Sequence, residues 1–67
     1  MKKFIGEFSI LEDLGFICNQ SRDYYFLPRK FMHRDYCPIS VDIKTRIVEY
    51  SDDNDLKLIE KFVEEIV

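Results

Sequence analysis

The sequence predicts one small α+β domain in which two helices cover one face of a mainly antiparallel, four-stranded sheet, in the order α-β-β-β-β-α. Apolar residues recur at helical spacing near both ends of the chain, and they alternate with polar residues over Cys37–Ile43. The length of 67 residues allows a single domain spanning residues 1–67. With 46% hydrophobic residues and only two Gly and two Pro, the composition is that of a chain that folds.

The first helix is predicted from five apolar residues that lie three and four positions apart. These are Phe4, Ile5, Phe8, Leu11 and Leu14. Gly15 then lies at the position after the helix where a left-handed backbone conformation commonly ends it. Gly6 weakens the first turn, and Ser9 with Glu12 forms an alternative capping box, so a later start stays open.

Four strands are predicted as two hairpins. The first hairpin joins Phe16–Gln20 to Tyr24–Leu27, which are rich in aromatic and apolar residues. The second joins the alternating strand Cys37–Ile43 to Arg46–Tyr50, whose β-branched and aromatic residues favour a strand. Between the hairpins, Arg29–Asp35 carries too many charges for a buried strand, so an exposed loop is predicted there. The sequence does not fix which face of the last strand points inward.

The last helix is predicted over Asp53–Val67. Its acidic start supplies candidate N-caps and places negative charge at the positive end of the helix dipole. One apolar stripe faces a charged outer side; the stripe consists of Leu56, Ile59, Phe62, Val63 and Ile66. The free energy gained by burying this stripe is about equal to the entropic cost of ordering the helix backbone. The helix therefore needs the apolar surface of the sheet.

The charge pattern and the apolar runs narrow the class of protein. The net charge is −3, with basic residues concentrated over 20–36 and acidic residues over 37–67, which is not the composition of a general nucleic-acid coat. The longest apolar run, Tyr24–Leu27, is far shorter than the roughly 20 residues of a membrane span. Acidic residues interrupt the N-terminal stretch before it could serve as a signal peptide. A cytoplasmic location without membrane contact is therefore expected.

The residue types predict neither catalysis nor metal binding. His33 and Cys37 lack the orienting third group and the oxyanion turn that thiol catalysis requires. Together with Cys18 they form no C-x-x-C pair, and the acidic run Asp52–Asp55 lacks the Gly and Glu of a calcium loop. We expect a non-enzymatic protein without cofactor or metal, in which both cysteines are free thiols that pack as small apolar residues.

The most distinctive polar region is the basic-aromatic segment 22–36. It interleaves cations with aromatic side chains, a mixture that is enriched in protein interfaces and that also suits bases and phosphates. The candidate partner-binding residues are Arg22, Tyr25, Arg29, Lys30, Phe31, His33, Arg34 and Tyr36. A plain core role for some aromatic residues of this segment stays open. The acidic outer side of the last helix is a second candidate surface.

Three segments, Leu11–Phe16, Ser40–Thr45 and Val63–Ile66, carry a resemblance to known proteins. In element order and composition the chain resembles short accessory proteins encoded by phages and prophages of low-GC bacteria. The resemblance implies a non-enzymatic regulator, a binder of a host factor or an anti-defence protein, and it carries over no site residues. The leading hypothesis is therefore a small protein-binding or regulatory module. The alternative is a nucleic-acid-binding protein that uses segment 22–36, and monomer and homodimer are equally open.

Overall fold

The computed structural model describes residues 1–31, 34–36, 38–51 and 53–66. The strands in these ranges are β1 Lys2–Phe4, β2 Ile17–Cys18, β3 Tyr24–Phe26, β4 Arg29–Phe31, β5 Arg34–Tyr36, β6 Ile39–Asp42, β7 Ile47–Tyr50 and β8 Val63–Glu65. The helical segments are α1 Phe8–Asp13, α2 Asp53–Leu56 and the 3-10 helix η1 Lys57–Phe62.

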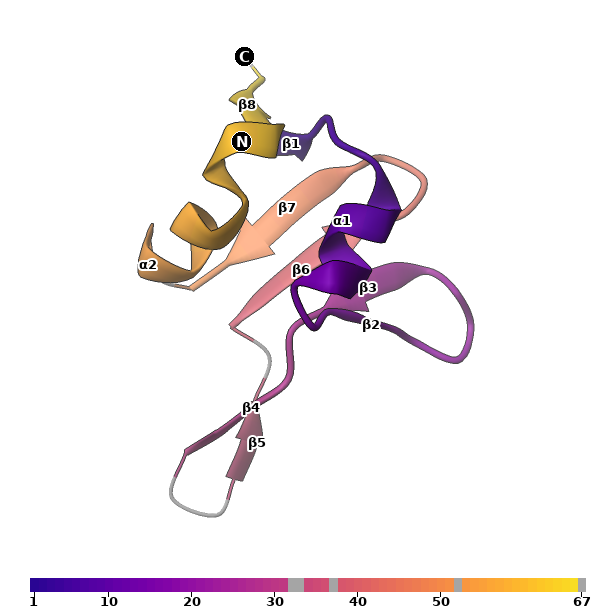
Figure 1. Cartoon of the computed structure of the whole chain (residues 1–67), viewed down its shortest axis with the longest axis vertical. Helices are drawn as coiled ribbons and strands as arrows, with labels where there is room; N and C mark the ends of the chain where they lie inside the picture. The colour runs from indigo at the N-terminus through magenta and orange to yellow at the C-terminus, as the bar shows by residue number, and fades with distance from the viewer. Residues whose placement is uncertain (32–33, 37, 52, 67) are drawn as a thin grey trace.

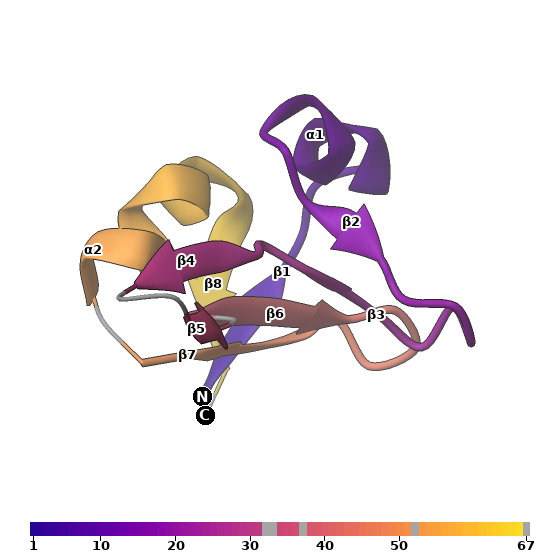
Figure 2. The ribbon, with the colours of Figure 1, turned by 90° about the horizontal axis from the view of Figure 1, so that it is seen from below.

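The described strands form a six-stranded sheet in the order β2-β3-β6-β7-β1-β8, in which all neighbours are antiparallel. A separate hairpin of β4 and β5 extends from one end of the molecule (Figure 1). The helical segments all lie on one side of the large sheet (Figure 2). No described helix or strand crosses the opposite side, which we call the open face.

The α+β class is observed, but the predicted four-stranded sheet flanked by two helices is wrong. Six strands form because the two ends of the described chain each add one strand: β1 precedes α1, and β8 follows η1. The two strands pair with each other, and β1 also pairs with β7. Such pairing between distant segments satisfies backbone groups in a way that local periodicity does not reveal.

The predicted first helix starts too early. Phe4 belongs to β1 and is fully buried, with its ring centroid 6.0 Å from that of Phe8 and 6.4 Å from that of Phe62. Glu7 has an extended backbone (φ −85°, ψ 144°), and α1 begins only at the next residue. Gly6, which stands between Phe4 and Glu7, lies very close to Phe62. A Cβ added at Gly6 would be 3.0 Å from Cδ1 of Phe62, and this tight approach favours glycine.

The predicted end of this helix is confirmed. Gly15 adopts the positive φ of 99° that a side chain disfavours. Its N–H donates to the carbonyl of Glu12 at 3.1 Å, and the N–H of Phe16 donates to the carbonyl of Leu11 at 2.9 Å. Both bonds belong to the Schellman motif, whose apolar contact is provided here by the buried pair Leu11 and Phe16.

Both predicted hairpins are present. In the first, the loop between β2 and β3 is closed by Asn19, whose Oδ1 accepts the N–H of Asp23 at 2.7 Å and that of Tyr24 at 3.0 Å. In the second, β6 pairs with β7 so that Val41 lies opposite Val48. Because both valines are buried, they settle which face of β7 points to the core.

The predicted exposed loop over 29–35 is wrong, because β4 and β5 form a hairpin there. The many charges of this segment disfavour a strand that is buried in a sheet. They do not disfavour a hairpin that stands away from the large sheet, as β4 and β5 do (Figure 1). Arg29 at its base remains exposed, and its Nη2 lies 3.6 Å from Oδ1 of Asp55 in α2.

The predicted last helix is also wrong beyond its first turns. Leu56, Ile59 and Phe62 are three residues apart, a spacing that a 3-10 helix with three residues per turn keeps on one side. The helical dihedrals already fail at Ile59 (φ −123°, ψ 16°). Val63 is then extended and pairs with Phe4, so residues 63–65 form strand β8. Leu56, Ile59, Phe62 and Val63 pack on the core as expected, but on a different backbone, and Ile66 lies beyond β8 and does not belong to this cluster.

The core lies between the sheet and the helical segments. The buried residues of the hydrophobic core are Phe4, Leu11, Phe16, Ile39, Val41, Val48 and Ile59. Half-buried side chains, among them Phe8, Tyr25 and Phe62, pack around them. Leu11 anchors α1 and Ile59 anchors η1, whereas α2 contributes no buried residue. No helix in the described ranges is long and apolar enough to span a membrane.

Candidate functional site

Side chains of the sheet alternate between the core and the open face. Since Val41 and Val48 point to the core, their neighbours along β6 and β7 point away from it. The register then places Tyr24 beside Asp42, and Ser40 beside Glu49. By this register the open face consists of Lys3, Ile17, Tyr24, Phe26, Ser40, Asp42, Ile47, Glu49 and Glu64.

Apolar and aromatic side chains lie on β2, β3 and β7 of the open face, and the polar Ser40 and Asp42 of β6 separate Ile47 from the others. Ile17 is 51% exposed and Tyr24 is 41% exposed, whereas Phe26 and Ile47 are half-buried. The rings of Tyr24 and Phe26 lie 5.8 Å apart at an interplanar angle of 56°. Large apolar side chains that are grouped on one surface are typical of interaction sites, whereas single ones are ordinary.

A shallow depression lies on this face across β3, β6 and β7. It is lined by Tyr24, Ser40, Asp42, Thr45, Ile47 and Glu49. Two of these side chains are carboxylates and none is a cation. Oδ1 of Asp42 accepts hydrogen bonds from the backbone N–H groups of Lys44 and Thr45, each at 2.8 Å. These bonds lower the pKa of Asp42, and the bond from Thr45 has the larger effect. The depression is therefore anionic at neutral pH.

The residues singled out from the sequence are distributed over several elements where the structure describes them. Arg22 is exposed in the β2–β3 loop with a φ of 56°, and that loop and the β4–β5 hairpin are separate projections in Figure 1. Arg29 and the backbones of Lys30, Phe31, Arg34 and Tyr36 belong to the hairpin. His33 lies outside the described residues.

Tyr25 lies on the core side of the sheet. Its ring stacks on that of Phe8, with centroids 5.4 Å apart, and its hydroxyl donates to Oε1 of Glu12 at 3.0 Å. Burial, followed by this hydrogen bond, raises the pKa of the Tyr25 hydroxyl. The contacts attach α1 to β3, so the structural role that the sequence left open describes this residue. Cys18 on β2 is a half-buried free thiol, as predicted, and Cys37 lies outside the described residues.

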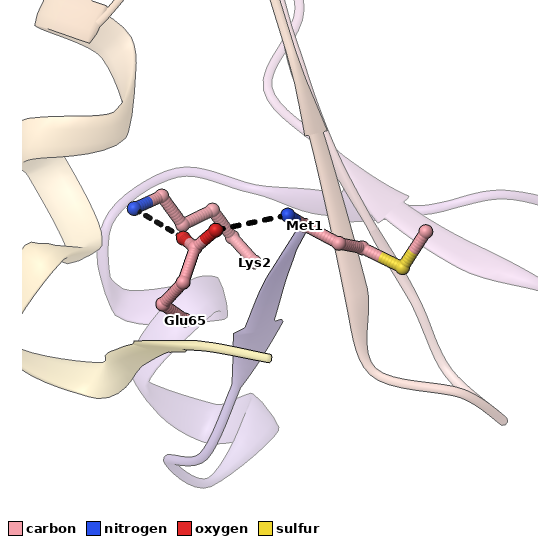
Figure 3. Close-up of polar contacts among 3 residues, drawn as sticks. All are labelled: Met1, Lys2 and Glu65. Atoms are coloured by element: carbon pink, nitrogen blue, oxygen red, sulfur yellow. Dashed lines mark hydrogen bonds and ion pairs between the residues drawn. The ribbon is translucent and has the colours of Figure 1, made fainter. Parts of the chain in front are cut away.

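The acidic outer side of the last helix does not exist as one surface, because the chain leaves the helix after Phe62. Glu60 stays on η1, Glu64 points to the open face and Glu65 to the other side of β8. Glu65 binds the N-terminal ammonium at 3.0 Å and Nζ of Lys2 at 2.6 Å, which fastens β8 to β1 (Figure 3). The bond from Lys2, followed by that from the ammonium, lowers the pKa of Glu65.

Glu65→Gln is expected to lower the melting temperature at neutral pH. A carboxylate with a lowered pKa stabilises the fold above its unfolded-state pKa, and this contribution disappears as the pH falls through the folded-state pKa. Calorimetry at a series of pH values should therefore find that the difference in melting temperature between Glu65→Gln and wild type vanishes in acid. Glu64→Gln changes the neighbouring carboxylate on the opposite face and is the matched control, since Glu64 takes part in neither of these two ion pairs. A difference for Glu65→Gln that persists in strong acid would contradict the assignment.

The open face could be found only with the register of the strands. The alternation of Ser40 and Asp42 with apolar residues in the sequence already indicated a polar side, but not that Tyr24 and Glu49 lie next to it. In the described part of the chain, no three His, Cys, Asp or Glu side chains are grouped so that they could hold a metal ion.

The fold and this surface define a small α+β protein with one uncovered sheet face. No family model matches the chain, and no significant match is found among curated proteins or among solved structures.

Proposed function

We propose that the chain is a small non-enzymatic protein-binding module whose contact surface is the open face of the sheet. The observation that carries this proposal is the exposure of Ile17 and Tyr24 beside Phe26 on a face that no described element covers. Aromatic side chains are enriched in protein interfaces. A regulatory accessory role in the cytoplasm, of the kind held by the phage-type proteins that the chain resembles, is part of the proposal.

Charge favours a protein over a nucleic acid as the partner of this face. Aromatic residues on a sheet can stack on bases, but such surfaces add cations that bind the phosphates. Here the aromatic residues lie beside the carboxylates of Asp42 and Glu49, which repel phosphates. Nucleic-acid binding therefore remains the alternative only for the β4–β5 hairpin, which carries Arg29, Lys30 and Arg34 in its sequence.

A pull-down from the native host cell tests the proposal with matched variants. Tyr24→Ser should weaken capture of the specific partner about tenfold or more, because a central aromatic contact typically carries about 2 kcal/mol. Leu14→Ser is the control, since Leu14 is 43% exposed at the end of α1, away from the open face. The proposal fails if Tyr24→Ser keeps every partner, or if both variants lose them equally.

A salt titration tests the alternative. If the hairpin binds phosphates, the affinity for DNA or RNA should fall log-linearly as salt rises, and a variant with Glu in place of Arg29, Lys30 and Arg34 should lose it. Absence of any retardation at low salt ends this alternative. The same triple variant in the pull-down shows whether the hairpin contributes to a protein contact.

A further inference from the structure

We infer that the depression on the open face receives a lysine or arginine side chain from the partner, presented by a segment with apolar residues on either side of it. This inference rests on the proposed function and names the chemistry that the same face recognises.

The register brings three suitable groups to one place. Tyr24 on β3 lies directly opposite Asp42 on β6, and Ser40 on β6 lies opposite Glu49 on β7. Cross-strand neighbours of this kind have Cβ atoms about 5 Å apart. A phenol ring and two carboxylates therefore surround a single depression. A cationic side chain is attracted by carboxylates and by the face of an aromatic ring alike.

The lining residues themselves leave this charge uncompensated, because none of the six is Lys or Arg. Asp42 is fixed in place by the backbone N–H groups of Lys44 and Thr45, both of which bind its Oδ1. The site is thus oriented before a partner arrives, which reduces the entropy lost on binding.

The apolar surroundings determine what flanks the cation. Ile17 and Phe26 extend the surface on the β2 side, and Ile47 lines the depression on β7. Side chains of a partner on either side of its cation would therefore meet apolar surface. Burying apolar area supplies the affinity, and the charged pair supplies the selectivity.

The same charges disfavour the other occupants of this face. A second copy that packed on the first with its two-fold axis through the depression would bring Asp42 and Glu49 of each copy toward the same residues of the other. Like charges that face one another are destabilising. A nucleic acid and an anionic membrane would be repelled for the same reason.

The test is a titration of ¹⁵N-labelled protein at low salt with a short peptide that alternates arginine with valine. Amide shifts are expected on β3, β6 and β7. The same peptide with neutral citrulline in place of arginine should bind about fivefold more weakly, the ratio that corresponds to one favourable exposed ion pair. Glu49→Gln should weaken the arginine peptide about three- to fivefold. Glu60→Gln, which removes an exposed carboxylate from η1 on the other side of the sheet, should leave the affinity within about twofold.

Each remaining result overturns the inference. Equal binding of the citrulline peptide at the open face would leave a purely apolar contact, so cation recognition would fail while the proposed function stood. Shifts confined to the hairpin, or no shifts at millimolar peptide, would exclude the depression as a cation site. If dilution of the protein alone, or a single-stranded oligonucleotide, moves the open-face amides, then a second copy or a nucleic acid occupies it. If, in addition, Tyr24→Ser keeps every partner in the pull-down, the proposed function is wrong as well.

Discussion

Replacing Ile59 with alanine should remove most of the free energy of unfolding. Ile59 is the fully buried residue of η1 and lies in the hydrophobic core, against which the half-buried Phe62 of the same segment also packs. Truncation of a buried isoleucine to alanine costs about 2–5 kcal/mol, because transfer energy is lost and a cavity is left. A domain of this size has only about 3–5 kcal/mol to lose. Urea denaturation followed by circular dichroism should find a much lower midpoint, or a protein that is largely unfolded without urea.

Leu58→Ala is the matched control for this prediction. Leu58 is the preceding residue on the same 3-10 helix, but its side chain is 43% exposed. Its truncation should change the free energy of unfolding by no more than about 0.5 kcal/mol. Equal destabilisation by the two variants would mean that η1 does not pack through Ile59.

Arg46→Ala should destabilise the protein by about 2–3 kcal/mol. Nη1 of Arg46 donates to the carbonyl of Gly6 at 2.7 Å and to that of Phe4 at 3.4 Å, and the guanidinium carbon lies 4.5 Å from the centre of the Phe8 ring. Hydrogen bonds to a charged group contribute about 1.5–3 kcal/mol and a cation–π contact about 0.5–1 kcal/mol. Without Arg46, the connection from β1 to α1 loses its attachment to the turn before β7.

Two further variants show whether the geometry of Arg46 matters. Arg46→Lys keeps the charge but lacks the planar guanidinium that lies over the Phe8 ring, so its stability should lie between those of wild type and Arg46→Ala. Lys44→Ala changes an exposed cation in the same turn and should stay within about 0.5 kcal/mol of wild type. Thermal unfolding of the three variants and the wild type under the same conditions measures these differences in stability. The assignment is wrong if Arg46→Ala is no less stable than Lys44→Ala.

Local signals were sufficient for the hairpins and for the end of α1. The alternation over β6 and the glycine at position 15 each act within a few residues, so both could be predicted from the sequence. The spacing of Leu56, Ile59 and Phe62 fits an α-helix and a 3-10 helix alike, and the local pattern does not distinguish them.

The other errors come from pairing between distant segments. Phe4 and Val63 each fit a helical stripe, yet they pair with each other on β1 and β8. The candidate site was harder to predict for the same reason. Composition pointed to the basic-aromatic segment 22–36, whereas the open face combines residues from separate strands and emerges only once Tyr24, Asp42 and Glu49 are in register.

The pairing of β1 with β8 has a consequence for synthesis of the chain. Met1 and Glu65, which are joined by an ion pair, stand 64 positions apart, so the pairing at this edge of the sheet closes a long loop. During synthesis β1 leaves the ribosome well before residues 63–65, which supply its neighbour β8. Until then the backbone groups of β1 that will face β8 have no strand to pair with, and an unpaired edge invites contact with other chains. Emergence of residues 63–65 therefore closes this edge of β1 to other chains.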